Sequence, residues 1–130
     1  MLRICFFFIL LSVCITNNSC NKYHKFHEGI FLLQEDRGIR IQRYKDKQVE
    51  YIGDSIVCLY SIKWISKRQY NLMLERVEKN SQALALPSEK DTVYVSIRKI
   101  IGNSSYTYSS YSKLNPTKFT GTLMKVKFQK

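Results

Sequence analysis

From Gly29 onward, apolar and polar residues alternate with a period of two, and turn residues interrupt the alternation repeatedly. Successive side chains of a strand point to opposite faces, so this pattern predicts half-buried strands rather than helices. The segments are also rich in β-branched and aromatic residues, which strands favour. We expect eight strands: Gly29–Gln34, Ile39–Tyr44, Gln48–Ile52, Ser55–Ile65, Tyr70–Val77, Thr92–Ile101, Ser104–Ser112 and Phe119–Phe128.

The connections between these segments are short, which favours antiparallel pairing of neighbours in the chain. The sequence therefore predicts a single all-β domain, an antiparallel up-and-down barrel or a strongly curled meander of about eight strands. A β-sandwich is the competing architecture. The residues expected to face the core include Ile41, Ile62, Trp64, Leu72, Val95 and Leu123.

Two places depart from the simple pattern. The longest gap, 78–91, contains Asn80–Leu86, which could form one or two helical turns before Pro87 ends them. In the last segment, Leu123 shares a face with Gly121, whereas Val126 lies on the other face. This change of phase predicts a bulge or twist near Met124.

The first nineteen residues have the pattern of a secretion signal. One basic residue, Arg3, precedes the apolar run Ile4–Ile15, which is too short to cross a bilayer as a helix. A polar stretch then ends in Ser19 and Cys20, which resembles the signal of bacterial lipoproteins, whose cysteine is acylated. Cys14 fits that signal less well because Val13 precedes it, and cleavage of an ordinary secretory signal is the alternative.

This interpretation divides the chain into a signal peptide (1–19), a lipidated tether (20–28) and a β domain (29–130). It predicts a secreted protein that its lipid anchors to the outer membrane. Lys22 and Lys25, rather than an acidic run, follow Cys20, which favours the periplasmic side.

Cysteine use limits the chemistry of the β domain. Cys58 is the single cysteine left in it, so no intrachain disulfide and no cysteine-based zinc site can form. Neither histidine lies near Cys58 in sequence, and we expect a buried structural thiol rather than a nucleophile.

The chain is strongly basic. Without residues 1–19, which hold only Arg3, the formal net charge falls from +11 to +10. The densest run contains Arg43, on the predicted face of Ile39 and Ile41, and four candidate contact residues: Arg37, Arg40, Lys45 and Lys47. We expect a solvated hairpin there, with contact to anionic lipid or glycan as the alternative, and no specific nucleic-acid partner.

Three aromatic residues are further candidates for ligand or surface contact. Trp64 is expected to plug one barrel end, or else to stack on a ligand. Tyr106 and Tyr108 could stack on a partner or face the core. Both histidines, His24 and His27, fall in the tether, where we expect a solvated stalk and no metal site.

Several motifs together resemble small Gram-negative lipoproteins of unknown function. They are Phe26-His27-Glu28-Gly29-Ile30-Phe31, the segment Ile39–Glu50, Ile62-Lys63-Trp64 with Tyr70-Asn71-Leu72, and Gly121-Thr122-Leu123. Some members of that group carry a DNA topoisomerase designation, which nothing in these residues supports. The opening aromatic-x-x-Gly-x-aromatic motif is also similar to that of lipocalin-like barrels.

We therefore expect a membrane-anchored, non-catalytic binding or interaction protein of the cell envelope. No nucleophile elbow, phosphate loop or dinucleotide fingerprint is present, and no cofactor is expected. The partner could be a small apolar ligand inside the barrel or an envelope protein on its surface. A structural protein that contacts anionic lipid or glycan, and a small hydrolase, are the alternatives.

Overall fold

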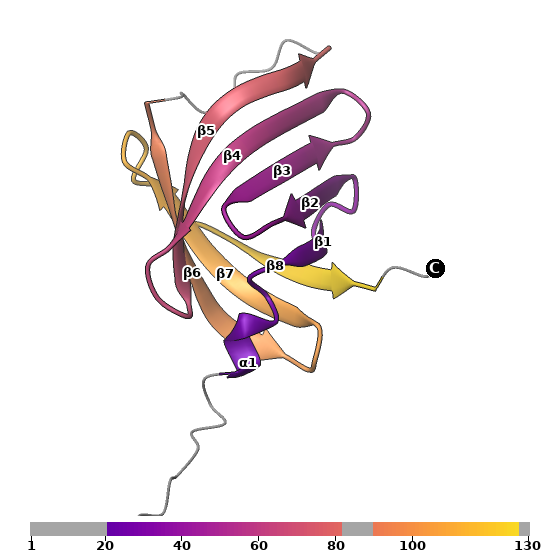
Figure 1. Cartoon of the computed structure of the whole chain (residues 1–130), viewed down its shortest axis with the longest axis vertical. Coiled ribbons are helices and arrows are strands. Elements are labelled where there is room, and N and C mark those ends of the chain that lie inside the picture. Colours follow the sequence, from indigo (N-terminus) through magenta and orange to yellow (C-terminus); the bar gives the residue numbers. More distant parts are fainter. Residues whose placement is uncertain (1–20, 82–89, 128–130) are drawn as a thin grey trace, which may run out of the picture.

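Eight strands close into one antiparallel barrel (Figure 1). The computed structural model describes residues 21–81 and 90–127. A short helix, α1 (Asn21–His24), precedes the strands β1 (Gly29–Leu33), β2 (Ile39–Arg43), β3 (Lys47–Ile52), β4 (Ile56–Trp64), β5 (Gln69–Asn80), β6 (Thr92–Ile101), β7 (Ser105–Ser112) and β8 (Phe119–Val126). No helix in this described part is long and apolar enough to span a membrane.

Each strand pairs with the next one in sequence, and β8 pairs with β1 to close the barrel. The all-β prediction and its barrel form are confirmed, and a sandwich is excluded. The register of the paired strands places the residues that were predicted to face the core inside the barrel. Buried residues of the two core clusters include Ile41, Ile62, Leu72, Val95 and Leu123, with Trp64 packed against both clusters.

The irregularities lie elsewhere than the sequence predicted. Register shifts occur between β4 and β5 at Val57/Cys58 and Leu59/Tyr60, and between β6 and β7 at Ile97/Lys99. The predicted bulge near Met124 is wrong, because β8 pairs without interruption. The phase does not change there: Lys125 holds the inward position opposite Phe31 at the barrel end, where a charged side chain can reach solvent.

The end of β5 also differs from its predicted boundary. The strand runs to Asn80 rather than Val77, because its pairing with β4 continues to Ile56↔Asn80. The helical turns expected within Asn80–Leu86 fall mostly on residues 82–89, which lie outside the described residues, as do 1–20 and 128–130.

The N-terminal segment closes one end of the barrel, which we call the α1 end (Figure 1). Phe26 is fully buried, and its ring meets the edge of Tyr106 with centroids 4.9 Å apart. The backbone amide of Phe26 donates to the carbonyl of Tyr23 at 3.0 Å. The stretch expected to be a solvated tether therefore packs onto the barrel, because it carries an aromatic side chain that the core accepts.

A buried arginine ties this segment to the strands. Arg43 is 2% exposed and lies on the inward face that the alternation predicted. Its Nη1 donates to the carbonyl oxygen of Phe26 at 2.8 Å and to Tyr106 Oη at 3.1 Å, and its Nη2 donates to Tyr70 Oη at 3.0 Å. The guanidinium also lies 4.7 Å from the ring centroid of Phe31.

A glutamine separates the buried arginine from the half-buried carboxylate of Glu50. Arg43 Nε donates to Gln48 Oε1 at 2.8 Å, and Gln48 Nε2 donates to Glu50 Oε1 at 3.0 Å. The amide thus turns its oxygen to the cation and its N–H to the carboxylate, which satisfies both groups. Burial raises the pKa of the Glu50 carboxyl, against the opposing effects of Gln48 and Arg43.

We predict that Arg43→Met lowers the free energy of unfolding by about 3–5 kcal/mol, because it leaves Glu50 and several buried acceptors without their cation. Arg40→Met is the control. Arg40 lies three residues earlier on β2, on the outer face, 4.2 Å from the Tyr51 ring centroid, and should change stability by no more than about 1 kcal/mol. Denaturant unfolding measures both, and equal losses would contradict the network's role.

Candidate functional site

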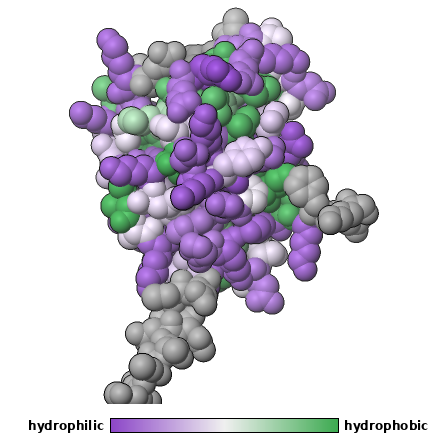
Figure 2. Space-filling view, in the orientation of Figure 1, coloured by the Kyte–Doolittle hydropathy of each residue, from purple (hydrophilic) through white to green (hydrophobic). Residues whose placement is uncertain are grey.

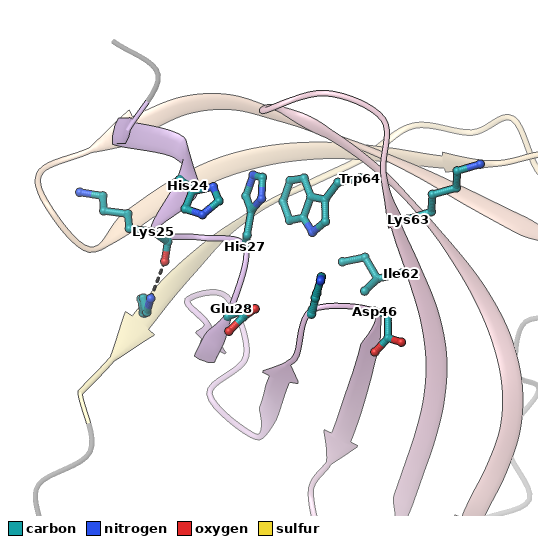
Figure 3. Close-up of a pocket in the computed structure, with 10 residues that line it drawn as sticks. His24, Lys25, His27, Glu28, Asp46, Ile62, Lys63 and Trp64 are labelled. Carbon is teal, nitrogen blue, oxygen red and sulfur yellow. Dashed lines mark hydrogen bonds between the residues drawn. The ribbon is translucent and has the colours of Figure 1, made fainter. Parts of the chain in front are cut away.

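A hollow with a volume of about 630 Å³ lies at the α1 end. It is open to the surface, and the N-terminal segment, the ends of β4 and β8 and the β2–β3 turn surround it (Figure 3). Its lining consists of His24, Lys25, His27, Glu28, Lys45, Asp46, Ile62, Lys63, Trp64 and Lys125.

A stacked pair of rings forms one wall of the hollow. The His27 and Trp64 rings lie 3.6 Å apart between centroids, with an angle of 11° between their planes. Trp64 is the last residue of β4. Phe26, which follows α1, is buried in the core, and its position places the next residue, His27, against Trp64. His27 Nε2 lies 3.2 Å from the carbonyl oxygen of Lys67. Since a carbonyl can only accept, Nε2 carries the proton.

The indole N–H of Trp64 has no hydrogen-bond partner. Trp64 Nε1 is the one buried side-chain nitrogen or oxygen in the described part of the chain that lacks one. In Figure 3 this nitrogen faces the side of the hollow on which Ile62 lies. An unsatisfied buried donor costs about 1–3 kcal/mol, so an acceptor that reached it from the hollow would bind favourably.

The hollow is basic, with four lysines against two carboxylates. Lys25 and Lys63 lie on opposite sides of its rim (Figure 3). Lys125 Nζ donates to the carbonyl oxygen of Lys25. Burial, together with the charge of Lys25, lowers the pKa of the Lys125 ammonium.

Gly29 makes room for Lys125. Its φ of +130° is a conformation that glycine adopts easily, and a Cβ placed on it would lie 2.6 Å from Lys125 Cε. The glycine of the aromatic-x-x-Gly-x-aromatic motif therefore lets a lysine from β8 cross β1 to reach the N-terminal segment.

The candidate contact residues from the sequence do not form one site. Trp64 and Lys45 line the hollow. Lys47 begins β3 at the same barrel end, whereas Arg37 lies in the β1–β2 turn at the opposite end. The basic run therefore spans the height of the barrel and makes no single patch.

The sequence left two options for Tyr106 and Tyr108, stacking on a partner or facing the core, and the structure places both toward the core. Tyr106 is fully buried, and Tyr108 is half-buried against both core clusters. Tyr108 lies opposite Gly121, where a Cβ would approach its ring atoms to 2.9 Å. Tyr106 therefore has no exposed surface for a partner, whereas the side chain of Tyr108 stays partly exposed.

Sequence reasoning missed most of the hollow. His24 and His27 were considered only as metal ligands, and the other lining residues not singled out as contacts are Lys25, Glu28, Asp46, Ile62, Lys63 and Lys125. For Lys125 a signal was present, since strict alternation through β8 places it inward. For the others no local signal exists, because barrel closure brings four separate segments together.

Cys58 and the histidines lie in different environments. Cys58 is buried at 1% exposure, and burial together with the nearby Glu50 raises the pKa of its thiol. The rings of His24 and His27 lie 4.9 Å apart. Within residues 21–81 and 90–127, no group of three or more His, Cys, Asp or Glu side chains is placed to hold a metal ion.

No family model, no curated protein and no solved structure matches the chain. Its site must therefore be interpreted from the chemistry of its own residues.

We predict that the fluorescence of Trp64, the only tryptophan, reports the protonation of His27. Burial lowers the pKa of His27 below its usual 6.5 despite the contact with Lys67. Since the unfolded chain then binds this proton more tightly, the stability contributed by neutral His27 is complete above pH 6.5 and is lost as the pH falls below it. Protonation next to the indole should quench its emission in that same window.

Two variants test this assignment. His27→Gln should abolish the acid transition in emission, whereas His24→Gln, which replaces the only other histidine, should keep it. A transition that persists unchanged in His27→Gln would show that another group controls the emission.

Proposed function

We propose that this protein is a lipid-anchored protein of the cell envelope, with a non-catalytic binding role centred on the α1 end of the barrel. The open hollow of about 630 Å³ carries the binding part of this proposal. Concave sites of this size, with an aromatic wall and a few convergent polar groups, are typical of ligand sites. The apolar run before Cys20 supports the anchor and the location outside the cytoplasm.

The packing of the barrel supports binding at its end rather than along its axis. Large side chains occupy the axis, and Arg43, Tyr106, Phe31 and Phe26 are each 2% exposed or less. An apolar ligand inside the barrel would have to displace this hydrogen-bonded cluster. A partner at the mouth meets exposed lysines and the Trp64–His27 pair with no such rearrangement.

The alternatives have less support. A hydrolase based on Cys58 would need a thiolate and a base, yet the thiol is buried and its pKa is raised. A structural role through the Arg37–Lys47 run would need one continuous surface, and the two ends of that run lie at opposite ends of the barrel.

The anchor is tested by metabolic labelling with a fatty-acid analogue. Wild-type protein should carry the label, and Cys20→Ser should lose it because the thiol that accepts the acyl group is absent. Cys14→Ser is the matched control within the same signal segment and should stay labelled. Label that survives in Cys20→Ser and disappears in Cys14→Ser would place the anchor at Cys14 instead. An absence of label from both the wild type and Cys14→Ser would refute the anchor.

A further inference from the structure

We infer that the α1 end of the barrel docks on the membrane and that its hollow takes the phosphate of an anionic lipid head group. This inference rests on the proposed lipid anchor at Cys20 and names the partner of the proposed binding site. Three features of the described residues support it: the place where the chain leaves the barrel, the distribution of charge, and the groups inside the hollow.

The first feature is the lack of a spacer between the anchor and the barrel. The residue after Cys20 begins α1, and consecutive Cα atoms are about 3.8 Å apart. From there the chain is fixed to the barrel by the burial of Phe26 and by the bond from Arg43 to the Phe26 carbonyl. Acyl chains on Cys20 would therefore bring the α1 end, rather than the opposite end, close to the membrane, where the charge of the lipids decides whether it docks.

The second feature is an uneven distribution of charge along the barrel axis. The α1 end has two carboxylates, Glu28 and Asp46, whereas the opposite end has Glu35, Asp36, Asp54, Glu78 and Asp91. Basic residues are most numerous at the α1 end: Lys22, Lys25, Lys45, Lys47, Lys63, Lys67, Arg68, Lys125 and Lys127. Figure 2 shows hydrophilic side chains over most of this face, its lower end included.

This uneven distribution of charge along the barrel changes how the excess of basic residues is interpreted. Along the sequence the basic residues are dispersed, but the fold brings an excess of them to the α1 end, which the anchor would turn to the membrane. A basic residue near an anionic membrane surface is attracted to it, and this attraction falls off within a Debye length. The opposite end, with nearly balanced charges, would face away.

The third feature is the chemistry of the hollow. Lys45 and Lys63 are exposed, and the one ion pair found among the described residues, Arg76–Glu78, lies elsewhere. Phosphate oxygens accept hydrogen bonds, and their negative charge would supply the partner that these ammonium groups lack. The unpartnered N–H of Trp64 supplies one more donor. Tryptophan is also favoured at head-group depth, where one part of the ring is apolar and the other is wet.

A head group fits this site better than an acyl chain does. Four lysines and two carboxylates surround the opening, and the core beneath it is filled by Phe26, Tyr106 and Arg43. A lipid tail would have to pass the charged rim and displace that cluster. A phosphate would stay at the rim, close to the lysines.

The test measures the depth of Trp64 in vesicles that hold the lipidated protein. Trp64 is the only tryptophan, so its quenching by a nitroxide on lipid head groups reports whether the α1 end touches the membrane. We expect strong quenching in vesicles containing phosphatidylglycerol and weak quenching in vesicles of phosphatidylcholine alone. The double variant Lys45→Gln/Lys63→Gln should fall to the phosphatidylcholine level, and high salt should weaken quenching of the wild type.

The control removes the same charge from the other end. Lys79 and Lys113 are exposed there, and Lys79→Gln/Lys113→Gln should keep the wild-type quenching. Equal loss in both double variants, or equal quenching of the wild type in both vesicle types, would overturn the docking. If inorganic phosphate changes Trp64 emission in phosphatidylcholine vesicles as strongly as phosphatidylglycerol does, the hollow is a site for a soluble anion instead.

Failure of this inference differs from failure of the anchor. If fatty-acid labelling shows no lipid on Cys20, the proposed function is wrong at its first step. If the protein is labelled but Trp64 stays unquenched in anionic vesicles, the anchor stands and the docking is wrong.

Discussion

The structure depends on one buried cation, the guanidinium of Arg43. It donates to a backbone carbonyl of the N-terminal segment and to two tyrosine hydroxyls, and Gln48 connects it to the half-buried Glu50. A planar group with five donors in a fixed fork can serve these acceptors together, whereas the point charge of a lysine cannot. Burial of such a charge is costly unless every partner is in place, so the arginine joins β2, β3, β5, β7 and the N-terminal segment into one unit.

This constraint determines where the barrel can bind something. Because the Phe26 carbonyl accepts from Arg43, the segment from α1 to β1 lies across the barrel end and holds His27 against Trp64. The same segment fills the axis with Phe26, and the space that remains is the open hollow at the rim. The wall of the hollow is thus fixed by the core, while Lys45 and Lys63 at its rim are exposed.

Local patterns in the sequence predicted the strands and the faces of their residues, because alternation depends only on neighbours in the chain. They placed Arg43 inward with Ile39 and Ile41. They did not predict that Phe26 would enter the core, since its partners Arg43 and Tyr106 lie 17 and 80 positions away and meet it only when the barrel closes. The hollow was missed for the same reason. The alternative interpretation of the basic run Arg37–Lys47 as a contact surface loses support because the two ends of that run lie at opposite ends of the barrel.

The central claim is that the N-terminal segment belongs to the cooperative fold and is no loose tether. Amide hydrogen exchange tests it most directly, at the amides of Phe26 and His27, which donate to the carbonyls of Tyr23 and His24 at 3.0 Å. The account predicts that both amides exchange as slowly as those of β1, because releasing them requires breaking the Arg43 cluster and hence global unfolding. Exchange at the rate of an unstructured peptide, with β1 still protected, would contradict it.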